Sequence, residues 1–364
     1  MKVLEQMQSY GHERVAFHHD AKTGLKAIIA IHSTVLGNAL GGTRRWAYAT
    51  ETDALHDVLR LSEGMTYKAA ASGLQMGGAK SIIILPSSTH QPTEAEARAM
   101  GRFVETFAGK YIAAEDVGVS PQFCDWMASE SKHVMGGNTV SHGGDPSPYT
   151  ALGCFNSMKA CLKHIGKPVD FKNVSVAIQG VGATGYRLAK LLREAGAMVY
   201  VTDVHVPTVK RAVEELGCVA LGNDKSLFAE KVDIVAPCAL GGILDEKAIA
   251  ELNCTIVCGT ANNQLAHAQR DGEAIAKRGI LYSPDFIANA GGLIRLAGLY
   301  LGMSEAAIDT KIEEIEATTH AVLREAGTGS TGAAAVAFAK RKIAAGAQKP
   351  ALQIAGCGSG CGCH

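Results

Sequence analysis

A glycine-rich turn between a short apolar run and an amphipathic helix constrains the fold more than any other feature of the sequence. The apolar run is 174–178, the helix is expected at 183–195, and the turn consists of Gly180, Val181, Gly182, Ala183, Thr184 and Gly185. In a βαβ unit the three glycines allow a tight turn, close approach of the backbone to a pyrophosphate, and close packing of helix on strand. The pyrophosphate would lie at the helix N-terminus, where unpaired N–H groups favour an anion. The turn predicts dinucleotide binding; the alternative is a chance glycine-rich turn.

An acidic residue, Asp203, follows the next expected strand, 198–202. A carboxylate at this point accepts hydrogen bonds from the adenosine ribose hydroxyls and repels a 2′-phosphate, which favours NAD over NADP. Asp203 could instead cap the helix that follows it. The nearby basic residues Lys210 and Arg211 leave NADP use open, although their place on a helix is typical of solvated side chains.

Strands and helices alternate regularly through the second half of the chain. We expect helices at 150–164, 183–195 and 206–216, and strands at 174–178, 198–202, 232–235, 255–258 and 280–282. This alternation predicts a parallel sheet covered by helices on both faces. Ser304 is expected to cap a long helix, and a last amphipathic helix follows 327–331.

The first half of the chain mixes the two element types, with a strand expected at 26–33 and helices at 51–71 and 94–107. Residues 136–148 are dense in Gly, Ser, Asp and Pro, so they mark a boundary. The sequence thus predicts an α/β protein with an N-terminal mixed α/β domain and a doubly wound Rossmann domain. The expected parts are 1–143, 144–328, a C-terminal helix at 329–350 that returns to the first domain, and a flexible Cys-rich tail at 351–364.

The composition excludes several classes of protein. The chain has 364 residues, is 47% hydrophobic and has a formal net charge of +0, so it can fill two ordinary cores. It has no basic cluster of the kind that binds nucleic acid. It has no apolar run of roughly 18 residues that could cross a membrane and no apolar leader at its start. We therefore expect a cytoplasmic protein without nucleic-acid or membrane partners.

Cysteine is frequent, with ten residues in the chain. Most are scattered singly through apolar or helical segments, as Cys154, Cys161, Cys238 and Cys254 are, which is typical of buried thiols. Cys357, Cys361 and Cys363 lie close together before His364 and could hold a soft metal. A flexible end is favoured instead, because no packed scaffold precedes these ligands to form a site. We expect no metal site.

Residues 73–81, GLQMGGAKS, are close in order to a phosphate-binding loop. Such a loop needs adjacent Gly and Lys, is entered from a strand and is left by a helix. Here Ala79 separates the pair, a helix-like run with Lys68 precedes the segment, and a strand is expected at 81–85. A different role is therefore expected for Lys80.

Several further motifs follow one another along the chain. They are GGTRRW (41–46), GMTYKAAASGLQMGGAKS (64–81), AAEDVG (113–118), SPYTALG (147–153), IQGVGATG (178–185), APCALGG (236–242), GTANNQL (259–265) and SPDFIANAGGLI (283–294). In order and spacing they resemble the Glu/Leu/Phe/Val dehydrogenases, above all the leucine and phenylalanine enzymes. The resemblance implies reversible oxidative deamination of an L-amino acid to its 2-oxo acid and ammonia, with NAD taking the α-hydride. It also implies a homo-oligomer assembled mainly through the first domain, and a cleft that closes over the substrate.

The resemblance assigns the catalytic roles to Lys80 and Asp116. Hydride leaves Cα only from a neutral amine, and water must then attack the iminium, so the site needs a base that is uncharged near working pH. A lysine buried beside another cation has a lowered pKa. By resemblance Lys80 is this base, acting through a water, Asp116 contacts the amino group, and Lys68 binds the substrate carboxylate. The alternative is a solvated surface network of three charged residues.

Further cofactor contacts follow from the same motifs. Asn262 and Asn289 match asparagines near the nicotinamide and substrate, although asparagine is also common in turns. Thr150 matches a residue near the nicotinamide, or it caps the helix that follows Pro148. The remaining positions matched to cofactor contacts are Ala236, Pro237, Cys238 and Ala261.

The resemblance places the substrate side chain against Leu40, Gly41, Met65, Ala114, Leu293 and Leu296. Glutamate-specific relatives carry a lysine at the position of Leu40, and an apolar residue there leaves a γ-carboxylate without a partner. We expect leucine, valine and isoleucine to be favoured. One alternative is a phenylalanine or other aromatic amino acid dehydrogenase. Another, of a different class, is a non-catalytic NAD-binding or metal-sensing protein. The presence of Lys68, Lys80 and Asp116 together disfavours this alternative. Ala79, where the family has a third glycine, and Arg45 are departures from the pattern.

The two leucines generate a test of specificity. Leucine dehydrogenases usually have valines at the positions of Leu293 and Leu296, and one methylene changes discrimination by about 1–3 kcal/mol. The double substitution L293V and L296V should shift the ranking of kcat/KM toward bulkier side chains. An unchanged ranking across an amino acid panel would show that these leucines are ordinary helix core.

Overall fold

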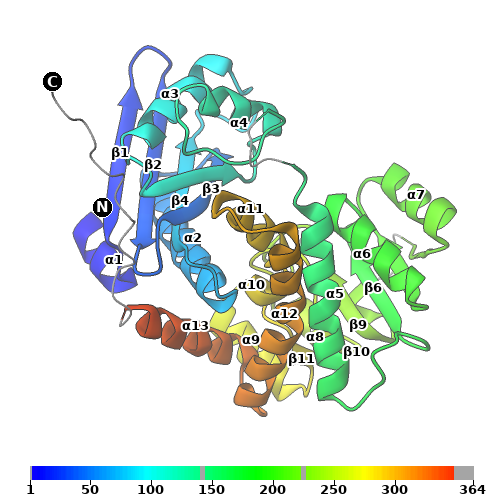
Figure 1. Ribbon diagram of the computed structural model, residues 1–364. Helices are drawn as coiled ribbons and strands as arrows, with labels where there is room; N and C mark the ends of the chain where they lie inside the picture. Colours follow the sequence, from blue (N-terminus) through cyan, green and yellow to red (C-terminus); the bar gives the residue numbers. More distant parts are fainter. Residues whose placement is uncertain (1, 140–143, 223–226, 348–364) are drawn as a thin grey trace, which may run out of the picture.

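The computed structural model describes residues 2–139, 144–222 and 227–347. It contains two β-sheets that lie side by side, each flanked by helices, with α10, α11 and α12 in the region between them (Figure 1). The bounds of these three helices are Asp285–Ala288, Gly291–Tyr300 and Glu305–Ala326. The predicted α/β architecture with a mixed first sheet and a parallel second sheet is confirmed.

The first sheet has five strands in the order β1-β2-β4-β3-β5. Strand β2 pairs antiparallel with β1 and β4, whereas β3 pairs parallel with β4 and β5. The strands are β1 (Arg14–Asp20), β2 (Leu25–Ser33), β3 (Ala39–Trp46), β4 (Gly77–Ile84) and β5 (Tyr111–Glu115). Helix α1 (Val3–Tyr10) precedes them.

Helices cover both faces of this sheet, which explains the continuous apolar run of β2. On one face Ile28 and Ala30 pack with Leu55 and Leu59 of α2 (Glu51–Ala71). On the other face the alternate residues of β2 pack with α3 (Glu94–Glu105) and α4 (Pro121–Ala128). A strand that is buried on both faces lacks the alternation of polar and apolar residues that a half-exposed strand has. Alternation along each strand therefore decides which side chains face α2.

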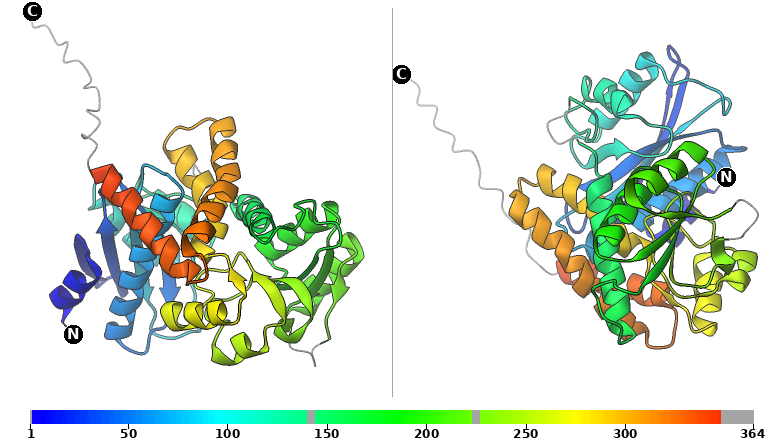
Figure 2. Two further views of the ribbon diagram at one scale, coloured as in Figure 1. Left: turned by 90° about the horizontal axis from the view of Figure 1, so that it is seen from below. Right: turned by 90° about the vertical axis from the view of Figure 1, so that its right-hand side faces the viewer.

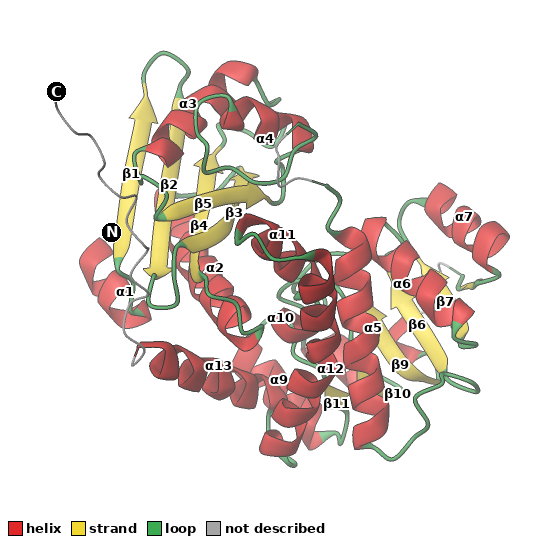
Figure 3. Ribbon diagram, in the orientation of Figure 1, coloured by secondary structure: helices red, strands yellow, loops and turns green. Residues whose placement is uncertain are grey.

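The second sheet has six strands in the order β11-β10-β9-β6-β7-β8, and all of its strand pairs are parallel. The strands are β6 (Ser175–Gln179), β7 (Met198–Thr202), β8 (Val219–Ala220), β9 (Val232–Pro237), β10 (Cys254–Val257) and β11 (Leu281–Tyr282). One face packs on α5 (Ser147–His164), α6 (Ala183–Glu194) and α7 (Val206–Leu216). The other packs on η1 (Leu227–Ala229), α8 (Glu246–Glu251) and α9 (Ala268–Lys277). This is the doubly wound order, and Figure 3 shows its strands apart from those of the first sheet.

The C-terminal helices connect the two halves. Ser304 caps α12, because its hydroxyl accepts a hydrogen bond from the N–H of Ala307, as the sequence predicts. Helix α12 packs against α5, and α13 (Thr331–Ala347) packs against both α12 and α2 (Figure 2). The chain thus returns to the first sheet's α2 after completing the second sheet.

The predicted elements correspond to observed ones with shifted ends, and the largest shift concerns β4. The sequence suggests a strand at 81–85, but β4 is Gly77–Ile84, so Lys80 lies within the strand and not in a loop. Glycines weaken strands on average, and here they allow close backbone approach. Helix α5 begins at Ser147, earlier than the expected residue 150. The domain limits remain predictions, and the tail 351–364 lies outside the described residues.

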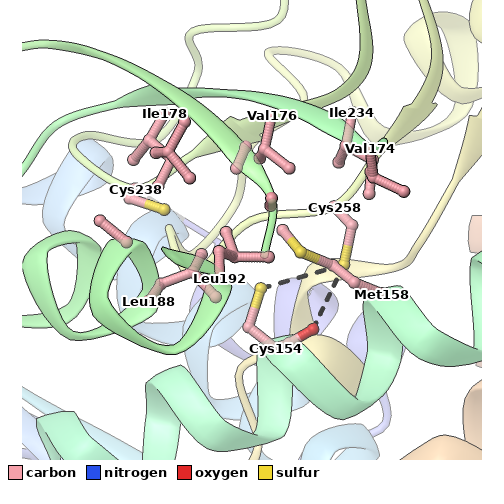
Figure 4. Close-up of a cluster of buried hydrophobic side chains, with 14 of the residues drawn as sticks. Cys154, Met158, Val174, Val176, Ile178, Leu188, Leu192, Ile234, Cys238 and Cys258 are labelled. Atoms are coloured by element: carbon pink, nitrogen blue, oxygen red, sulfur yellow. Dashed lines mark hydrogen bonds between the residues drawn. The ribbon is translucent and has the colours of Figure 1, made fainter. Parts of the chain in front are cut away.

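The cysteines of the described segments are free thiols, and all but the partly exposed Cys254 are buried. In Figure 4 the thiols of Cys154 on α5 and Cys258 after β10 face each other among aliphatic side chains, with their sulfur atoms 3.9 Å apart. Within the segments that the structure describes, no group of three or more His, Cys, Asp and Glu residues is arranged to hold a metal ion. Those same segments contain no helix long and apolar enough to cross a membrane.

Two buried histidines join α1, β2 and α2. His12 Nε2 lies 2.7 Å from the hydroxyl of Ser62, and His32 Nδ1 lies 2.8 Å from that of Thr66. The two rings meet edge to face at 4.9 Å between their centroids. Burial, with a smaller contribution from His32, lowers the pKa of His12 from 6.5 to about 4. The fold therefore holds this imidazole neutral.

Stability should consequently fall in mild acid. Because the folded pKa of His12 is below its unfolded value, the unfolded chain binds more protons between pH 6.5 and about 4. The free energy of unfolding should drop through this window by about 2–3 kcal/mol from His12 alone. Denaturant titrations of the wild type and of His12→Gln should show a smaller drop in the variant. Equal drops would contradict this account.

Candidate active site

A buried cluster of charges lies where β3, β4 and β5 face helix α2. Asp116 follows β5, and its Oδ2 accepts hydrogen bonds from Lys80 Nζ at 3.0 Å and from Arg44 Nε at 2.8 Å. Lys80 is 5% exposed. Burial raises the pKa of Asp116, but Lys80 and Arg44 together lower it to about 2, so the carboxylate is ionised.

The pKa of Lys80 is lowered, mainly by burial. Asp116 acts in the opposite direction and Arg44 in the same direction as burial. The side chain reaches this cluster because strand residues alternate between faces, and Lys80 shares the α2 face with Ile82. This is the environment that favours a proton-transfer lysine.

Strand β3 approaches its neighbours closely because it carries two glycines. A Cβ on Gly41 would lie 1.7 Å from the carbonyl oxygen of Ala79, and a Cβ on Gly42 would lie 2.9 Å from the Cβ of Asp116. The hydroxyl of Tyr111 on β5 donates a hydrogen bond to the Gly41 carbonyl of β3 at 2.9 Å, which adds a side-chain link between these two strands. A Cβ on Gly42 would also lie 2.5 Å from the Glu115 carbonyl oxygen, so the end of β5 that leads to Asp116 would have to shift.

Lys68, at the end of α2, faces the same region and is half-buried. Burial lowers its pKa to about 8, and the neighbouring Lys80 adds to this effect. Asp285 of α10 raises it, so a carboxylate of the second half lies close enough to act on a lysine of the first. Burial in turn raises the pKa of Asp285, whose oxygens accept the N–H groups of Gln264 and Phe286.

An apolar wall adjoins these charges. Leu40 and Ala114 are buried in one cluster with Leu293 of α11, and Met65 and Leu296 pack partly buried against it. The structure thus places five of the six residues expected at the substrate side chain in one apolar cluster, and the sixth, Gly41, follows Leu40 on β3. The same cluster contains Met135, which lies outside the motifs and is not among the expected site residues.

The glycine-rich turn has the geometry that the sequence predicts. Gly180 has φ +93, and a Cβ on Gly185 would lie 1.9 Å from the carbonyl oxygen of Gly180, so helix α6 packs tightly on the turn. A Cβ on Gly182 would meet no atom within 4 Å. Ala183 and Thr184 begin α6 directly after it. An open backbone at a helix N-terminus suits a pyrophosphate.

Asp203 follows β7 and lies beside this turn. Its Oδ2 accepts the N–H of Val181 at 2.8 Å, and its Oδ1 accepts that of His205 at 2.9 Å. His205 occupies the N-cap position of α7, and no side chain caps this helix. Asp203 is therefore not the cap of α7. The carboxylate is therefore held at the strand end, where it can accept further hydrogen bonds. Lys210 and Arg211 are exposed and pair with Glu214 and Glu215.

The two predicted asparagines touch each other. Asn289 Nδ2 donates to Asn262 Oδ1 at 2.7 Å and to the carbonyl of Ala261 at 3.3 Å. Its Oδ1 is buried and has no partner among the described residues. A buried polar atom without a partner is costly. An amide group of this kind is suited to bind a ligand between the two halves.

Other expected cofactor residues lie around the turn. Ala236 and Pro237 end β9, the N–H of Cys238 donates to the Gln179 carbonyl at 2.7 Å, and the hydroxyls of Thr184 and Thr260 are 2.8 Å apart. Thr150 lies inside the first turn of α5. Its hydroxyl donates to the Pro146 carbonyl at 3.1 Å, so it is not the helix cap.

The two departures from the family pattern have simple explanations. Ala79 is buried among side chains that face α3 and α4, on the side of the sheet away from Lys80. Arg45 points to that side as well, where its Nη2 lies 2.9 Å from the Glu96 carboxylate in a buried pair. Neither residue contacts the charge cluster.

Comparison with known proteins places this arrangement in a family. Residues 12–133 match the family model described as Glu/Leu/Phe/Val dehydrogenase, dimerisation domain, and residues 202–349 match that of the Glutamate/Leucine/Phenylalanine/Valine dehydrogenases. The chain belongs to the Glu/Leu/Phe/Val dehydrogenase family. The resemblance of its motifs is thereby confirmed.

Several relatives cover most of the chain. It is 42% identical to a leucine dehydrogenase of Thermoactinomyces intermedius over 86% of each protein. It is also 42% identical to a valine dehydrogenase of Streptomyces virginiae, over 87% of this chain and 88% of that protein. The crystal structure of L-tryptophan dehydrogenase from Nostoc punctiforme superimposes with a TM-score of 0.83 at 36% identity, covering 95% of this chain and 100% of the other.

The glycine turn of this dehydrogenase allows a paired test of stability. Gly185→Ala would drive a methyl group into the Gly180 carbonyl and should lower the free energy of unfolding by about 2 kcal/mol or more. Gly182→Ala meets open space and should change it by less than about 0.5 kcal/mol. Thermal and denaturant unfolding measure both. Equal destabilisation by the two alanines would contradict the packing described for α6.

Proposed function

We propose that the protein catalyses the NAD-dependent, reversible oxidative deamination of an apolar L-amino acid. In the forward direction the amino acid, water and NAD⁺ give the 2-oxo acid, ammonium, NADH and a proton. The observation that carries the proposal is the buried contact of Lys80 with Asp116 beside an apolar wall. A neutralisable lysine, an ionised carboxylate and an apolar pocket are the parts that this reaction needs.

The charged residues divide the work between the substrate's polar groups. Lys68, protonated when it meets an anion, binds the substrate carboxylate, which would raise the pKa that burial has lowered. Asp116 holds the substrate amine. Lys80 accepts a proton through a water, and then directs water onto the iminium carbon. Closure of the two halves would exclude other water from these steps.

NAD is the proposed cofactor, and bound in the second half it would accept the α-hydride of the substrate. The residues present fit this group. Gly182 leaves its backbone open, α6 presents its N-terminus, and Asp203 presents a carboxylate for ribose hydroxyls. The unpartnered Oδ1 of Asn289 is a suitable acceptor for a carboxamide N–H or an amine.

Leucine, valine and isoleucine are the proposed substrates. Leu40 is buried in the apolar wall, and its side chain offers no charge to pair with a γ-carboxylate. The relatives named for leucine and valine support this class, and the one named for L-tryptophan keeps an aromatic substrate as the second candidate.

We also propose a homo-oligomer assembled through the first half of the chain. The family model that covers residues 12–133 is named for dimerisation. Strand β1 lies at an edge of the first sheet and exposes Phe17, which suits contact with a second copy.

The test is NADH formation at alkaline pH with NAD or NADP and a panel of leucine, valine, isoleucine, phenylalanine, tryptophan, glutamate and alanine. Activity with NAD on a branched aliphatic substrate is expected. Lys80→Ala should lower kcat by at least about a hundredfold. Lys190→Ala, which removes an exposed lysine on α6, should not.

If a folded protein that binds NADH shows no activity with any amino acid of the panel, the proposed activity is overturned. Full activity of Lys80→Ala would overturn the role of this lysine. A preference for phenylalanine or tryptophan would move the assignment to the aromatic candidate.

A further inference from the structure

Arg44 connects the charge cluster to a second carboxylate, that of Asp57. Asp57 lies outside the quoted motifs, and the family resemblance assigns it no role. The guanidinium of Arg44 forks: Nε lies 2.8 Å from Asp116 Oδ2, and Nη1 lies 3.0 Å from Asp57 Oδ2. The side chain is 18% exposed. A planar fork bound at two points has little freedom to rotate, so Arg44 fixes the distance between the two carboxylates.

Asp57 is anchored from further sides. Its Oδ2 also accepts the hydroxyl of Tyr48 at 2.7 Å, and its Oδ1 accepts Arg60 Nη2 at 3.1 Å. Because Asp57 and Arg60 both belong to α2, the second carboxylate is tied to the helix that carries Lys68. Arg44 therefore joins strand β3 and helix α2 to the carboxylate that follows β5.

Both cations bind the same oxygen of Asp116. Lys80 and Arg44 contact Oδ2, and among the residues that the structure describes Oδ1 accepts no hydrogen bond. Asp116 is 15% exposed at its side chain, so the carboxylate is not sealed off. The contacts of Oδ2 hold the plane of the carboxylate, and Oδ1 remains available for a ligand.

We infer that Arg44 is a positioning residue: anchored to Asp57, it holds Asp116 against Lys80 with Oδ1 free for the substrate amine, and it keeps a second positive charge beside the Lys80 amine. This inference rests on the proposed function, which names the substrate amine. It goes beyond that function by giving a task to Arg44, Asp57 and Tyr48.

The charge of Arg44 has a consequence for proton transfer. The charged groups that face Lys80 are Asp116 after β5, Arg44 on β3, and Asp57 and Lys68 on α2. Arg44 lowers the pKa of Lys80, whereas Asp116 and Asp57 raise it. Removing Arg44 should thus make the lysine harder to deprotonate, and removing the charge of Asp57 should make it easier.

The experiment measures kcat/KM for L-leucine and NAD against pH in four variants. Arg44→Gln should move the acid limb of the profile up by about one pH unit, which is a tenfold loss at a fixed pH on that limb. Asp57→Asn should move it down, by less, because Asp57 contacts Arg44 and not Lys80. The ionisation of the free substrate is the same in every assay, so differences between variants belong to the enzyme.

Two further variants separate the effect of the positive charge of Arg44 from that of its two-point binding and from a general loss of stability. Arg44→Lys keeps the charge but binds at one point, so it should restore the pH midpoint while kcat stays below wild type. Arg45→Gln removes the neighbouring arginine, which is paired with Glu96 on the opposite face. It should lower stability without moving the pH limb.

A limb that stays in place in Arg44→Gln, or that moves equally in Arg45→Gln, would overturn the inference. If Arg44→Gln does not fold, the direction of the Asp57→Asn shift decides. If the wild type is inactive on the whole panel, the proposed function fails separately. The pH dependence of Lys80 acetylation by acetic anhydride is then read by mass spectrometry in the same variants. Its midpoint should rise in Arg44→Gln, fall in Asp57→Asn and stay in place in Arg45→Gln, and any other result would refute the inference.

Discussion

The candidate active site depends on one carboxylate oxygen that is shared by a buried lysine and a largely buried arginine. Asp116 Oδ2 binds both Lys80 and Arg44, so β3, β4 and the end of β5 must be placed together before this contact can form. A charge buried without partners is strongly unfavourable. The ionised carboxylate therefore stabilises Lys80, and it gives Arg44 a partner in addition to Asp57. The same burial that makes the cluster hard to build lowers the pKa of Lys80 and suits it to proton transfer.

Close backbone packing makes this placement possible in both halves of the molecule. Gly41 and Gly42 let β3 lie against β4 and β5, which leaves room for the side chains of Lys80 and Asp116. In the second half Gly185 lets α6 lie against the turn of Gly180. The helices between the sheets complete the arrangement, since α11 supplies Leu293 to the apolar wall and α10 places Asp285 near Lys68. Each half thus presents its functional groups toward the other.

The sequence predicts the second sheet well because its pattern is local. Strand–helix alternation, the glycine turn and Asp203 are each recognisable within a short window, and the structure has them in the doubly wound order. It predicts the first sheet less completely: β1, β3 and β5 are not among the expected strands, and β4 begins in a glycine pair that reads as a loop. The pairing of Arg44 with Asp57 could not be predicted, since it depends on how β3 packs against α2. Thr150 shows the same limit: the motif locates the residue, but only the packing of α5 shows that its hydroxyl bonds to Pro146.

The most direct test of the central claim is the titration of the Lys80 amine itself. In protein labelled with ¹³C at the lysine ε-carbons, the Lys80 resonance is identified by its loss in Lys80→Arg, and its chemical shift is followed against pH. We predict a midpoint below that of the exposed lysines of the same chain, because burial and Arg44 outweigh the attraction of Asp116. A midpoint equal to or above that of the exposed lysines would contradict the claim that the fold prepares this lysine as the base.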